Sequence, residues 1–499
     1  MRPDSEYMLG IDLGTSECKA CLVSHDGEIA ASARYPYPTH CPAPAWAEQE
    51  PDDWLAAVRA VTGKVLATTG LPPSRIAGLS FSSAAHIGVL LDQHNRPVRR
   101  AILWNDQRSA EEAAWLARRH STEILSLTYQ GVSTTWLLPH LLWIRAKEPE
   151  NWARVRRLML SKDYVIERLT GHALTDPATA VSSLLYDAIS GQWSSDLCAL
   201  AGISPESLPE VRPATTVAGR LTEAAAAPLG LLSGTPIVLG TLDSAAEMYG
   251  AGALRSGNCV LRLATAGGLQ LVVSRPQPDP RLITYPHPLA PLWYCQAGTN
   301  SCASAVRWAS QALTGGQTVN YEQWDEWAAA VPPGCGGLLF HPYLMGERAP
   351  YWDPGLRASF VGITIQHGPG HFARAVYEGA AFSVRDAFSV LTDLGVSDDP
   401  LTALGGGALS RLWVQIMADV LGRSLLVAPG IDSSYGAALL GLVGLGMVAE
   451  PHAVAITRWG SGTAIAPIPE NQALYDRLFG AYLRVYTQLA PLYATEWRA

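Results

Sequence analysis

Two aspartates stand where a carboxylate could take part in catalysis. Asp12 ends the apolar segment that starts at Met8, and the small-residue turn Gly14-Thr15-Ser16 follows it. Asp243 follows the apolar segment 235–240 and precedes alanine-rich sequence typical of a helix. A carboxylate at the C-terminal end of a strand can act as a general base, and one beside a phosphate-binding turn can hold a hydrated Mg²⁺. We expect Asp243 to be the base, and both Asp12 and Asp243 to lie at the metal.

Each aspartate also has a structural interpretation. Ser244-Ala-Ala-Glu247 fits a capping box, so Asp243 could serve only the N-terminus of a helix. Asp12 could be an Asx-turn residue. A second hairpin-like segment of the chain carries Arg262 at the position of Asp12, so this hairpin does not require an acid there. That comparison favours a functional role for Asp12.

The two hairpin-like segments, residues 10–24 and 260–274, lie 250 positions apart. Each is an apolar strand, a turn of small residues with a hydroxyl (Thr15 or Thr265), and a second apolar strand. Small side chains let backbone N–H groups reach an anion, so two such turns facing one gap would clamp phosphates. Two ordinary β-hairpins are the alternative, but the constant offset favours duplicated half-molecules.

Three further features are less specific. The turn Gly405-Gly406-Gly407-Ala408 separates a predicted strand from a predicted helix, where a ring or phosphate can approach the backbone. It lacks the spacing of a dinucleotide fingerprint or a P-loop, so a simple turn at the start of a helix is the alternative. His86 could be a buried, hydrogen-bonded histidine, and Trp104 could be ordinary core.

The elements that would position these residues alternate between strands and helices. Strands are predicted at 8–12, 18–24, 28–35, 76–81, 88–91, 101–104 and 235–240, with helices at 52–69 and over much of 106–170. The second half predicts a hairpin at 259–274, strands at 293–296, 337–340, 401–404 and 424–427, and helices at 303–313, 371–394, 410–421 and 472–492. This pattern indicates an α/β fold with mixed sheets flanked by helices in both halves. A hinge is expected near 240–257.

Bulk properties exclude several classes of protein. A chain of 499 residues suits two large domains. A net charge of −8 disfavours nucleic-acid binding, and neither a signal peptide nor a membrane span is expected, which favours a cytoplasmic protein. Cys18 and Cys21 would point to opposite faces of one strand, which disfavours a metal site or disulfide.

Several segments in order resemble the FGGY family of carbohydrate kinases, and within it most closely the xylulokinase branch. The matching segments are 10–16 (the opening phosphate turn), 46–54 (W-x-E-Q-x-P-x-x-W), 101–108 (W-N-D-x-R), 343–350 (Y-L-x-G-E-R-x-P), and 358–363 with 371–378 (the second family signature). The resemblance covers nearly the whole chain. It implies two actin-like (ribonuclease H-like) ATPase domains with ATP in the interdomain cleft. We expect these domains at 1–246 and 247–499, with the last helix, from about 470, packing back on the first.

The resemblance also implies site residues. Asp243 corresponds to the catalytic Asp, and Asp12 to the magnesium-linked Asp. The sugar contacts implied are Ala85, His86, Trp104, Asp106, Asp243 and Ser244. The ATP contacts implied are Gly14, Thr15, Ser16, Thr265, Ala266, Gly267, Gly406, Gly407, Ala408 and Ser410. The partners implied are a small sugar and ATP with Mg²⁺, and a homodimer is left open.

This chain departs from the family pattern in its sugar pocket. Ala84-Ala85 stands where xylulokinases usually have Gln-Met before His86, and Ser244 stands where they usually have Asn. His140 replaces a Lys, and the turn 264–267 reads Ala-Thr-Ala-Gly instead of Gly-Thr-Ser-Gly, changes that should leave the reaction intact. Phosphorylation of D-xylulose to D-xylulose 5-phosphate is the leading expectation. Another pentulose, a polyol or gluconate (with Arg108 as the candidate cation) is an alternative, as is a non-catalytic sugar- and nucleotide-binding regulator.

Overall fold

The computed structural model describes residues 6–316, 320–428, 430–448 and 464–495. Its first half is built on a six-stranded sheet in the order β13-β14-β5-β1-β2-β3. These strands span Val217–Arg220, Pro236–Leu242, Ile76–Ser83, Tyr7–Leu13, Glu17–Ser24 and Ile29–Pro36. β1, β2 and β3 form an antiparallel meander, whereas β5 runs parallel to β1 and β14 runs parallel to β5.

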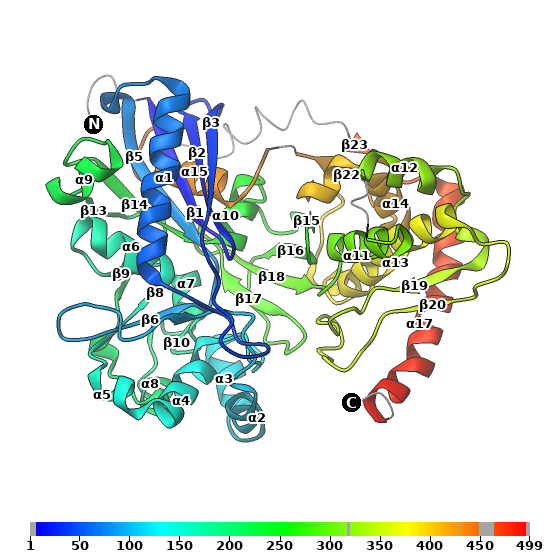
Figure 1. Cartoon of the computed structure of the whole chain (residues 1–499), viewed down its shortest axis with the longest axis horizontal. Helices are drawn as coiled ribbons and strands as arrows, with labels where there is room; N and C mark the ends of the chain where they lie inside the picture. Colours follow the sequence, from blue (N-terminus) through cyan, green and yellow to red (C-terminus); the bar gives the residue numbers. More distant parts are fainter. Residues whose placement is uncertain (1–5, 317–319, 429, 449–463, 496–499) are drawn as a thin grey trace.

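The second half contains a seven-stranded sheet in the order β17-β18-β16-β15-β21-β22-β23. Its strands span Ile283–Pro286, Trp293–Gly298, Gly267–Val273, Cys259–Leu263, Leu401–Leu404, Leu425–Val427 and Ala464–Ile465. Here the β15–β16 hairpin has the parallel strand β21 at its side, as the β1–β2 hairpin has β5. The expected mixed sheets and the duplicated hairpin are therefore present, one in each lobe of the molecule (Figure 1).

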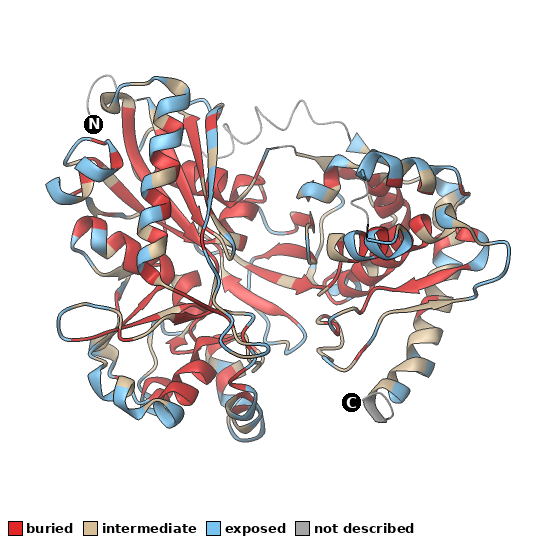
Figure 2. Cartoon of the chain, viewed as in Figure 1, coloured by how far each residue is buried: buried red, intermediate tan, exposed pale blue. Residues whose placement is uncertain are grey.

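Helices cover both sheets, whose strands are largely buried (Figure 2). In the first lobe α1 (Pro51–Thr69) packs on β2 and β3. In the second lobe the long helix α13 (Pro369–Ser389) packs on α11 (Ala303–Leu313) and α14 (Arg411–Leu421). The predicted helix at 371–394 is thus shorter at its C-terminal end, and the strand expected at 101–104 is limited to β7 (Ala101–Ile102).

The segment expected to be rich in helices contains five of them. They are α2 (Ala110–Arg119), α3 (Ser121–Thr128), α4 (Leu137–Lys147), α5 (Pro149–Arg154) and α6 (Ser161–Thr170). The first lobe also holds β4 (Glu48–Gln49), β6 (Gly88–Leu91), β8 (Arg157–Leu160), β9 (Leu174–Thr175), α7 (Pro177–Val181), β10 (Tyr186–Asp187), β11 (Gln192–Trp193), α8 (Ser195–Ala201), β12 (Glu210–Val211) and α9 (Glu223–Leu229). The second lobe adds α12 (Tyr321–Ala329), β19 (Leu339–His341) and β20 (Ser359–Val361).

Late in the sequence the chain returns from the second lobe to the first, but it does not do so with its last helix. α15 (Ser433–Gly444) comes late in the sequence and packs on β1, β5 and α10 (Asp243–Gly250) of the first lobe. Gly10 makes this approach fit, because a Cβ there would lie 1.9 Å from the carbonyl oxygen of Ser434. A first domain that ends at 246 therefore leaves out a helix that completes its own core.

The terminal helix α17 (Pro469–Thr495) packs on α14 and β19 of the second lobe. Its Tyr475 and Tyr482 are buried in that lobe's core. The expectation that this helix returns to the first domain is wrong. We propose counting α15 with the first lobe and α17 with the second.

Cys18 and Cys21 lie on β2 and are buried in different clusters of the hydrophobic core, as expected for alternating side chains. In the described part of the chain, none of the helices combines the length and the apolar character needed to cross a membrane.

Candidate active site

Asp243 is the first residue of α10, directly after β14. Its Oδ1 accepts a hydrogen bond from the backbone N–H of Ser244 at 2.7 Å, and the side chain stays partly accessible. Burial raises the pKa of this carboxyl, and the positive charge of Arg262 opposes the rise. The alternative capping box does not form, because Leu242 is the N-cap residue and Glu247 pairs with Arg262 instead.

Asp12 lies on β1 and is almost fully buried. Its Oδ1 accepts a hydrogen bond from the hydroxyl of Ser82, on the adjacent strand β5, at 2.9 Å. Burial raises the pKa of Asp12 to about 7, with further upward contributions from Asp243 and Asp432 and an opposing one from Lys19. The acidic groups are thus close enough to repel one another.

Charges from both lobes meet at these acids. Arg262, on β15 of the second lobe, lies 3.2 Å from Glu247 of α10, and its charge also acts on Asp243 and Asp12. Arg262 occupies in the second hairpin the place of Asp12 in the first. Because it reaches the acids of the first lobe, the two hairpins face the same gap.

The first phosphate turn is held by side chains from two other segments. The Tyr37 hydroxyl donates to the carbonyl of Gly14, and the Gln49 amide donates to the carbonyl of Thr15 at 2.7 Å. Trp104 Nε1–H donates to the hydroxyl of Thr15 at 2.9 Å, which leaves the hydroxyl proton free to reach an anion. Ser16 is exposed at the tip.

The second turn rests on the start of α11. The carbonyl of Ala264 accepts from the N–H of Ala303, and the carbonyl of Thr265 accepts from the hydroxyl of Ser304 at 2.8 Å. Thr265 itself is exposed, with Ala266 partly buried beside it. Gly267 donates its N–H to the hydroxyl of Thr299 at 3.2 Å. This N–H, which was expected to bind an anion, is therefore already used within the protein.

The glycine turn adjoins the second phosphate turn. Gly405 has φ +90°, and a Cβ there would lie 2.5 Å from the carbonyl oxygen of Leu263, the last residue of β15. A Cβ at Gly407 would meet the Trp413 ring at 2.6 Å, while Gly406 faces open space and Ala408 is buried. Gly406 is therefore the member of this turn whose backbone a ligand can approach.

Ser410 does not have the free hydroxyl expected of a nucleotide contact. It caps α14 by accepting from the N–H of Trp413 at 3.1 Å, and it donates to Asp325 at 2.9 Å. The sequence pattern could not separate these two uses, because a serine before a helix serves either one.

His86 lies on the sugar side of the expected cleft and is buried with φ +68°. Its Nδ1 lies 3.0 Å from the carbonyl oxygen of Ser182, so this nitrogen carries the proton. Its Nε2 can then accept from the Tyr285 hydroxyl at 3.3 Å. Burial lowers the pKa of His86 to about 4, so the ring is neutral. His86 is therefore buried and hydrogen-bonded, with Tyr285 of β17 in the other lobe as one partner, and its contact with a sugar stays a prediction.

Tyrosines extend this contact toward Asp243. The rings of Tyr285 and Tyr294 lie 5.5 Å apart, and the Tyr294 hydroxyl is 2.9 Å from the hydroxyl of Ser244. Ala85, next to His86, is partly buried. A row of aromatic side chains thus connects His86, beside Ala85, to Ser244, and Ala85 and Ser244 are two of the positions at which the chain departs from the family pattern.

Two expectations for the segment 101–108 are wrong. Asp106 is buried and accepts from the N–H of Ala47 at 2.6 Å and from Arg108 at 2.8 Å, so its carboxylate does not reach a sugar. Arg108, named for a gluconate carboxylate, stacks on Trp46 at 3.9 Å and also pairs with Glu48. Both side chains hold the loop that carries Trp104.

Sequence reasoning missed several residues that the fold brings to the cleft. Lys19 stands opposite Asp12 across the β1–β2 hairpin, a pairing that the period of two could have predicted. Asp432, the N-cap of α15, lies 4.0 Å from Lys19. Tyr285 and Tyr294 carried no signal, because only the tertiary fold places them beside His86 and Ser244.

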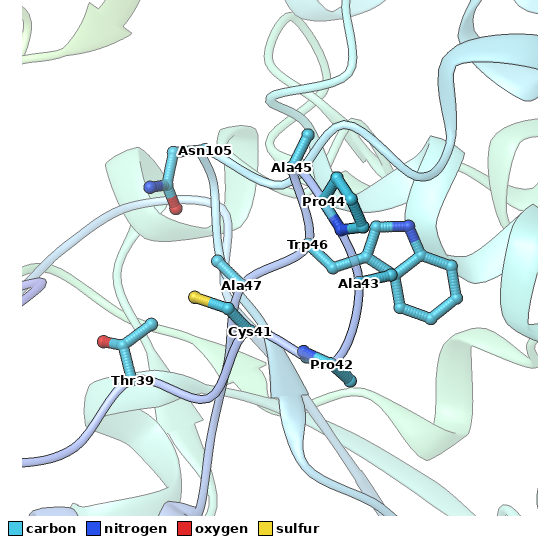
Figure 3. A pocket seen from close by; sticks show the side chains of 9 residues that line it. All are labelled: Thr39, Cys41, Pro42, Ala43, Pro44, Ala45, Trp46, Ala47 and Asn105. Atoms are coloured by element: carbon cyan, nitrogen blue, oxygen red, sulfur yellow. The ribbon is translucent and has the colours of Figure 1, made fainter.

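A surface hollow of about 540 Å³ lies beside the Trp104 loop, lined mainly by small and proline side chains from 39–47 together with Asn105 (Figure 3). It contains no carboxylate or cation. The cluster of charged side chains from both lobes, around Asp12, Asp243 and Arg262, is the better candidate site.

The acids of the cleft fit Mg²⁺ in a particular way. Within the described ranges no three His, Cys, Asp or Glu side chains form a closed metal cage. Asp12 and Asp243 instead interact through charge, and burial is the main cause of the raised pKa of both carboxyls. This suits a cation that takes one or two protein carboxylates and completes its shell with water and phosphate oxygens.

Comparison with known proteins shows the family of this chain. The N-terminal domain of the FGGY family of carbohydrate kinases matches residues 7–250, and its C-terminal domain matches residues 265–449. The chain is 30% identical to a xylulose kinase of Bacillus subtilis over 98% of each chain. It is 29% identical to a gluconokinase of the same species over 97% of this chain and 98% of that one. The crystal structure of a xylulose kinase from Rhodospirillum rubrum, 32% identical, superposes with a TM-score of 0.89 over 98% of this chain and 100% of that one.

Proposed function

Because the chain belongs to the FGGY family of carbohydrate kinases, with its two actin-like α/β domains and its use of ATP, we propose that it phosphorylates a primary hydroxyl of D-xylulose. The observation that supports the catalytic assignment is the position of Asp243, at the end of β14 and within the electrostatic reach of Asp12 and Arg262. A base there faces the phosphate turns of both lobes.

In the proposed reaction Asp243 accepts the proton of the sugar hydroxyl. The sugar oxygen forms a bond to the γ-phosphorus of ATP, and the bond from that phosphorus to the β,γ-bridging oxygen breaks to release ADP. Backbone N–H groups of the two turns and the Thr15 and Thr265 hydroxyls bind the phosphates. Asp12 together with Asp243 would hold Mg²⁺, which would neutralise charge on the phosphates. Closure of the lobes excludes water as a competing acceptor.

Gluconate is the second candidate substrate, because gluconokinases are also among the relatives of this chain. The short side chains of Ala85 and Ser244 alter the pocket at the two positions that would face a sugar hydroxyl. Sites built to hydrogen-bond one hydroxyl discriminate strongly against analogues that lack it, so these positions decide the substrate. Arg108, enclosed by Trp46 and Asp106, cannot supply a cation for gluconate.

An ADP-coupled assay with D-xylulose, other pentuloses, polyols and gluconate tests the proposal. We expect sugar-dependent ADP release to be fastest with D-xylulose. Asp243→Asn should lower kcat by on the order of 10² or more, the scale for a positioned base. Asp476→Asn, on the surface of α17, is the matched control. Sugar and ADP binding without ADP release from ATP would instead support the regulator, and near-normal turnover of D243N would remove the base from Asp243.

A further inference from the structure

Several arginine side chains that are largely removed from water pair with carboxylates, whereas Arg348 does not do so within the described residues. Arg99 pairs with Glu48 and Glu148, Arg108 with Asp106, and Arg374 with Glu378 at 2.8 Å. Arg348 forms no ion pair with any residue of the described ranges, and its Nε has no hydrogen-bond partner there although that atom is buried. An unpaired guanidinium removed from water is costly, so its charge calls for an anion.

The fold makes specific room for this side chain. Arg348 lies over the end of β18, where a Cβ at Gly298 would stand 3.0 Å from its Nη2. That nitrogen donates to the carbonyl of Thr299 at 2.8 Å. Thr299 in turn accepts from the N–H of Gly267, so Arg348 is anchored to the strand that supports the second phosphate turn. A Cβ at position 298 would require the guanidinium to shift by a few tenths of an ångström.

Its immediate neighbour, Glu347, acts on Arg348 through charge, but its carboxylate oxygens are hydrogen-bonded to other groups. Glu347 is buried and accepts from the N–H groups of Asn300 at 2.6 Å and Arg348 at 2.8 Å, and from the Ser383 hydroxyl at 2.8 Å. Burial raises the pKa of Glu347 to about 7, so this carboxyl is a weak source of negative charge near neutral pH. Glu347 thus orients the backbone at Arg348 but leaves the guanidinium available.

Arg348 interacts through charge with two residues of the proposed site, His86 and Arg262. On one side its charge helps to lower the pKa of His86, which lies in the sugar pocket. On the other side the charge of Arg262, the cation beside Asp243, helps to lower the pKa of Arg348 itself. The acceptor hydroxyl and the γ-phosphate must meet between these two groups.

We propose that Arg348 binds the phosphoryl group while it passes from ATP to the sugar. The inference rests on the proposed kinase reaction and deepens it. A guanidinium presents a planar fork of donors to the oxygens of a phosphoryl group, and Nε and the free Nη donors are the ones available here. Arg348 makes and breaks no bond. It stabilises the negative charge on the transferred oxygens while Asp243 takes the proton and ADP departs.

The test uses a readout that does not depend on which sugar is the substrate. Thermal unfolding of the whole protein is followed with Mg²⁺ and ADP, and then with fluoroaluminate added as an analogue of the phosphoryl group in transit. We expect fluoroaluminate to raise the Tm of the wild-type protein further above its value with Mg²⁺ and ADP. In Arg348→Ala this additional rise should disappear while the rise due to Mg²⁺ and ADP remains. Arg348→Lys should retain part of it, because it keeps the charge but loses the fork.

Steady-state kinetics provide a second test of the proposal. With the best sugar of the panel, R348A should lower kcat by about 10²-fold, the scale for one donor to a developing charge, and leave the KM of the sugar within about threefold. Arg385→Ala is the matched control, because this arginine lies outside the cleft between Asp476 and Phe479.

The outcomes separate the two hypotheses. An unchanged fluoroaluminate effect in R348A, or a large rise in the sugar KM with normal kcat, would overturn the inference and assign Arg348 to sugar binding or to structure. A wild-type protein whose Tm responds to neither ADP nor fluoroaluminate would instead contradict the proposed kinase function.

Discussion

Trp104 Nε1–H donates a hydrogen bond of 2.9 Å to the hydroxyl of Thr15. This bond joins the loop after β7, expected at the sugar, to the turn expected at the phosphates. The Gln49 amide meets the same turn at the carbonyl of Thr15. Two sequence motifs that are separate in the chain therefore both contact Thr15. Changes to these contacts should affect the binding of both the sugar and ATP.

Trp104→Phe should weaken both sugar and ATP binding. Phenylalanine keeps an aromatic ring but has no N–H, so the Thr15 hydroxyl loses its donor. A hydrogen bond is worth about 0.5–1.5 kcal/mol net, which corresponds to KM increases of about 2- to 12-fold for both substrates. Steady-state kinetics measure this change, with Trp308→Phe on the exposed face of α11 as the control. An effect on the sugar KM alone would show that the bond does not couple the two ends.

Ser244→Asn introduces the asparagine usual in xylulokinases next to Asp243, but it should be tolerated only if the Tyr294 hydroxyl is also removed. The two hydroxyls are 2.9 Å apart, so a longer side chain at 244 meets the Tyr294 hydroxyl. We expect S244N alone to lose activity and S244N/Y294F to recover it. The double variant should also show a higher ratio of kcat/KM for D-xylulose to that for gluconate.

Tyr294→Phe alone is the control for the Ser244 series, since it removes the hydroxyl without adding an amide. If S244N were fully active without the second change, Tyr294 would not limit the pocket at this position.

Asp12 should make the ligand-free protein less stable as pH rises. Burial raises its pKa from the ordinary 3.8 to about 7, so the folded state binds an extra proton between these two pH values. The stability associated with that proton is full at low pH and is lost as pH rises toward 7. Asp12→Asn stays neutral, so its Tm advantage over wild type should grow from pH 5 to pH 8.

Thermal unfolding in a pH series measures the Asp12 effect, with Asp476→Asn as a surface control. Saturating Mg²⁺ and ADP should remove the advantage of D12N, because the bound cation stabilises the charged carboxylate. A Tm difference that is constant across the pH range would contradict the raised pKa.

His86 should contribute a hydrogen bond and no charge to the pocket. Burial lowers its pKa to about 4, so the ring stays neutral from pH 8 to pH 5. In NMR spectra its imidazole signals, assigned by their loss in His86→Asn, should not shift over this range. Signals of solvent-exposed histidines, whose reference pKa is about 6.5, provide the internal control. A titration of His86 near pH 6.5 would be the contrary result.

Much of the fold was predictable because it rests on local patterns. The hairpins β1–β2 and β15–β16 follow from apolar alternation interrupted by small-residue turns, and their repeat at one offset predicted two similar sheets. The destination of the C-terminal helices was not predictable in this way. An amphipathic face shows that a helix is packed but not against which partner, and for that reason α17 was expected on the wrong lobe.

The residues of the candidate site also separate into those that local sequence predicts and those that only the tertiary fold reveals. The sequence by itself determined Asp12, Asp243 and the glycine-bearing turns, because strand ends and small residues carry their consequences locally. It could not separate Asp106 and Ser410, whose polar groups are consumed by Arg108 and Asp325, from groups left free for a ligand. Only the tertiary structure decided that, and only it brought Tyr285 to His86 and Arg262 to Glu247 and left Arg348 Nε without a partner in the described ranges. Hydrogen bonding and charge act through space, so residues that are distant in the chain decide which polar groups remain available.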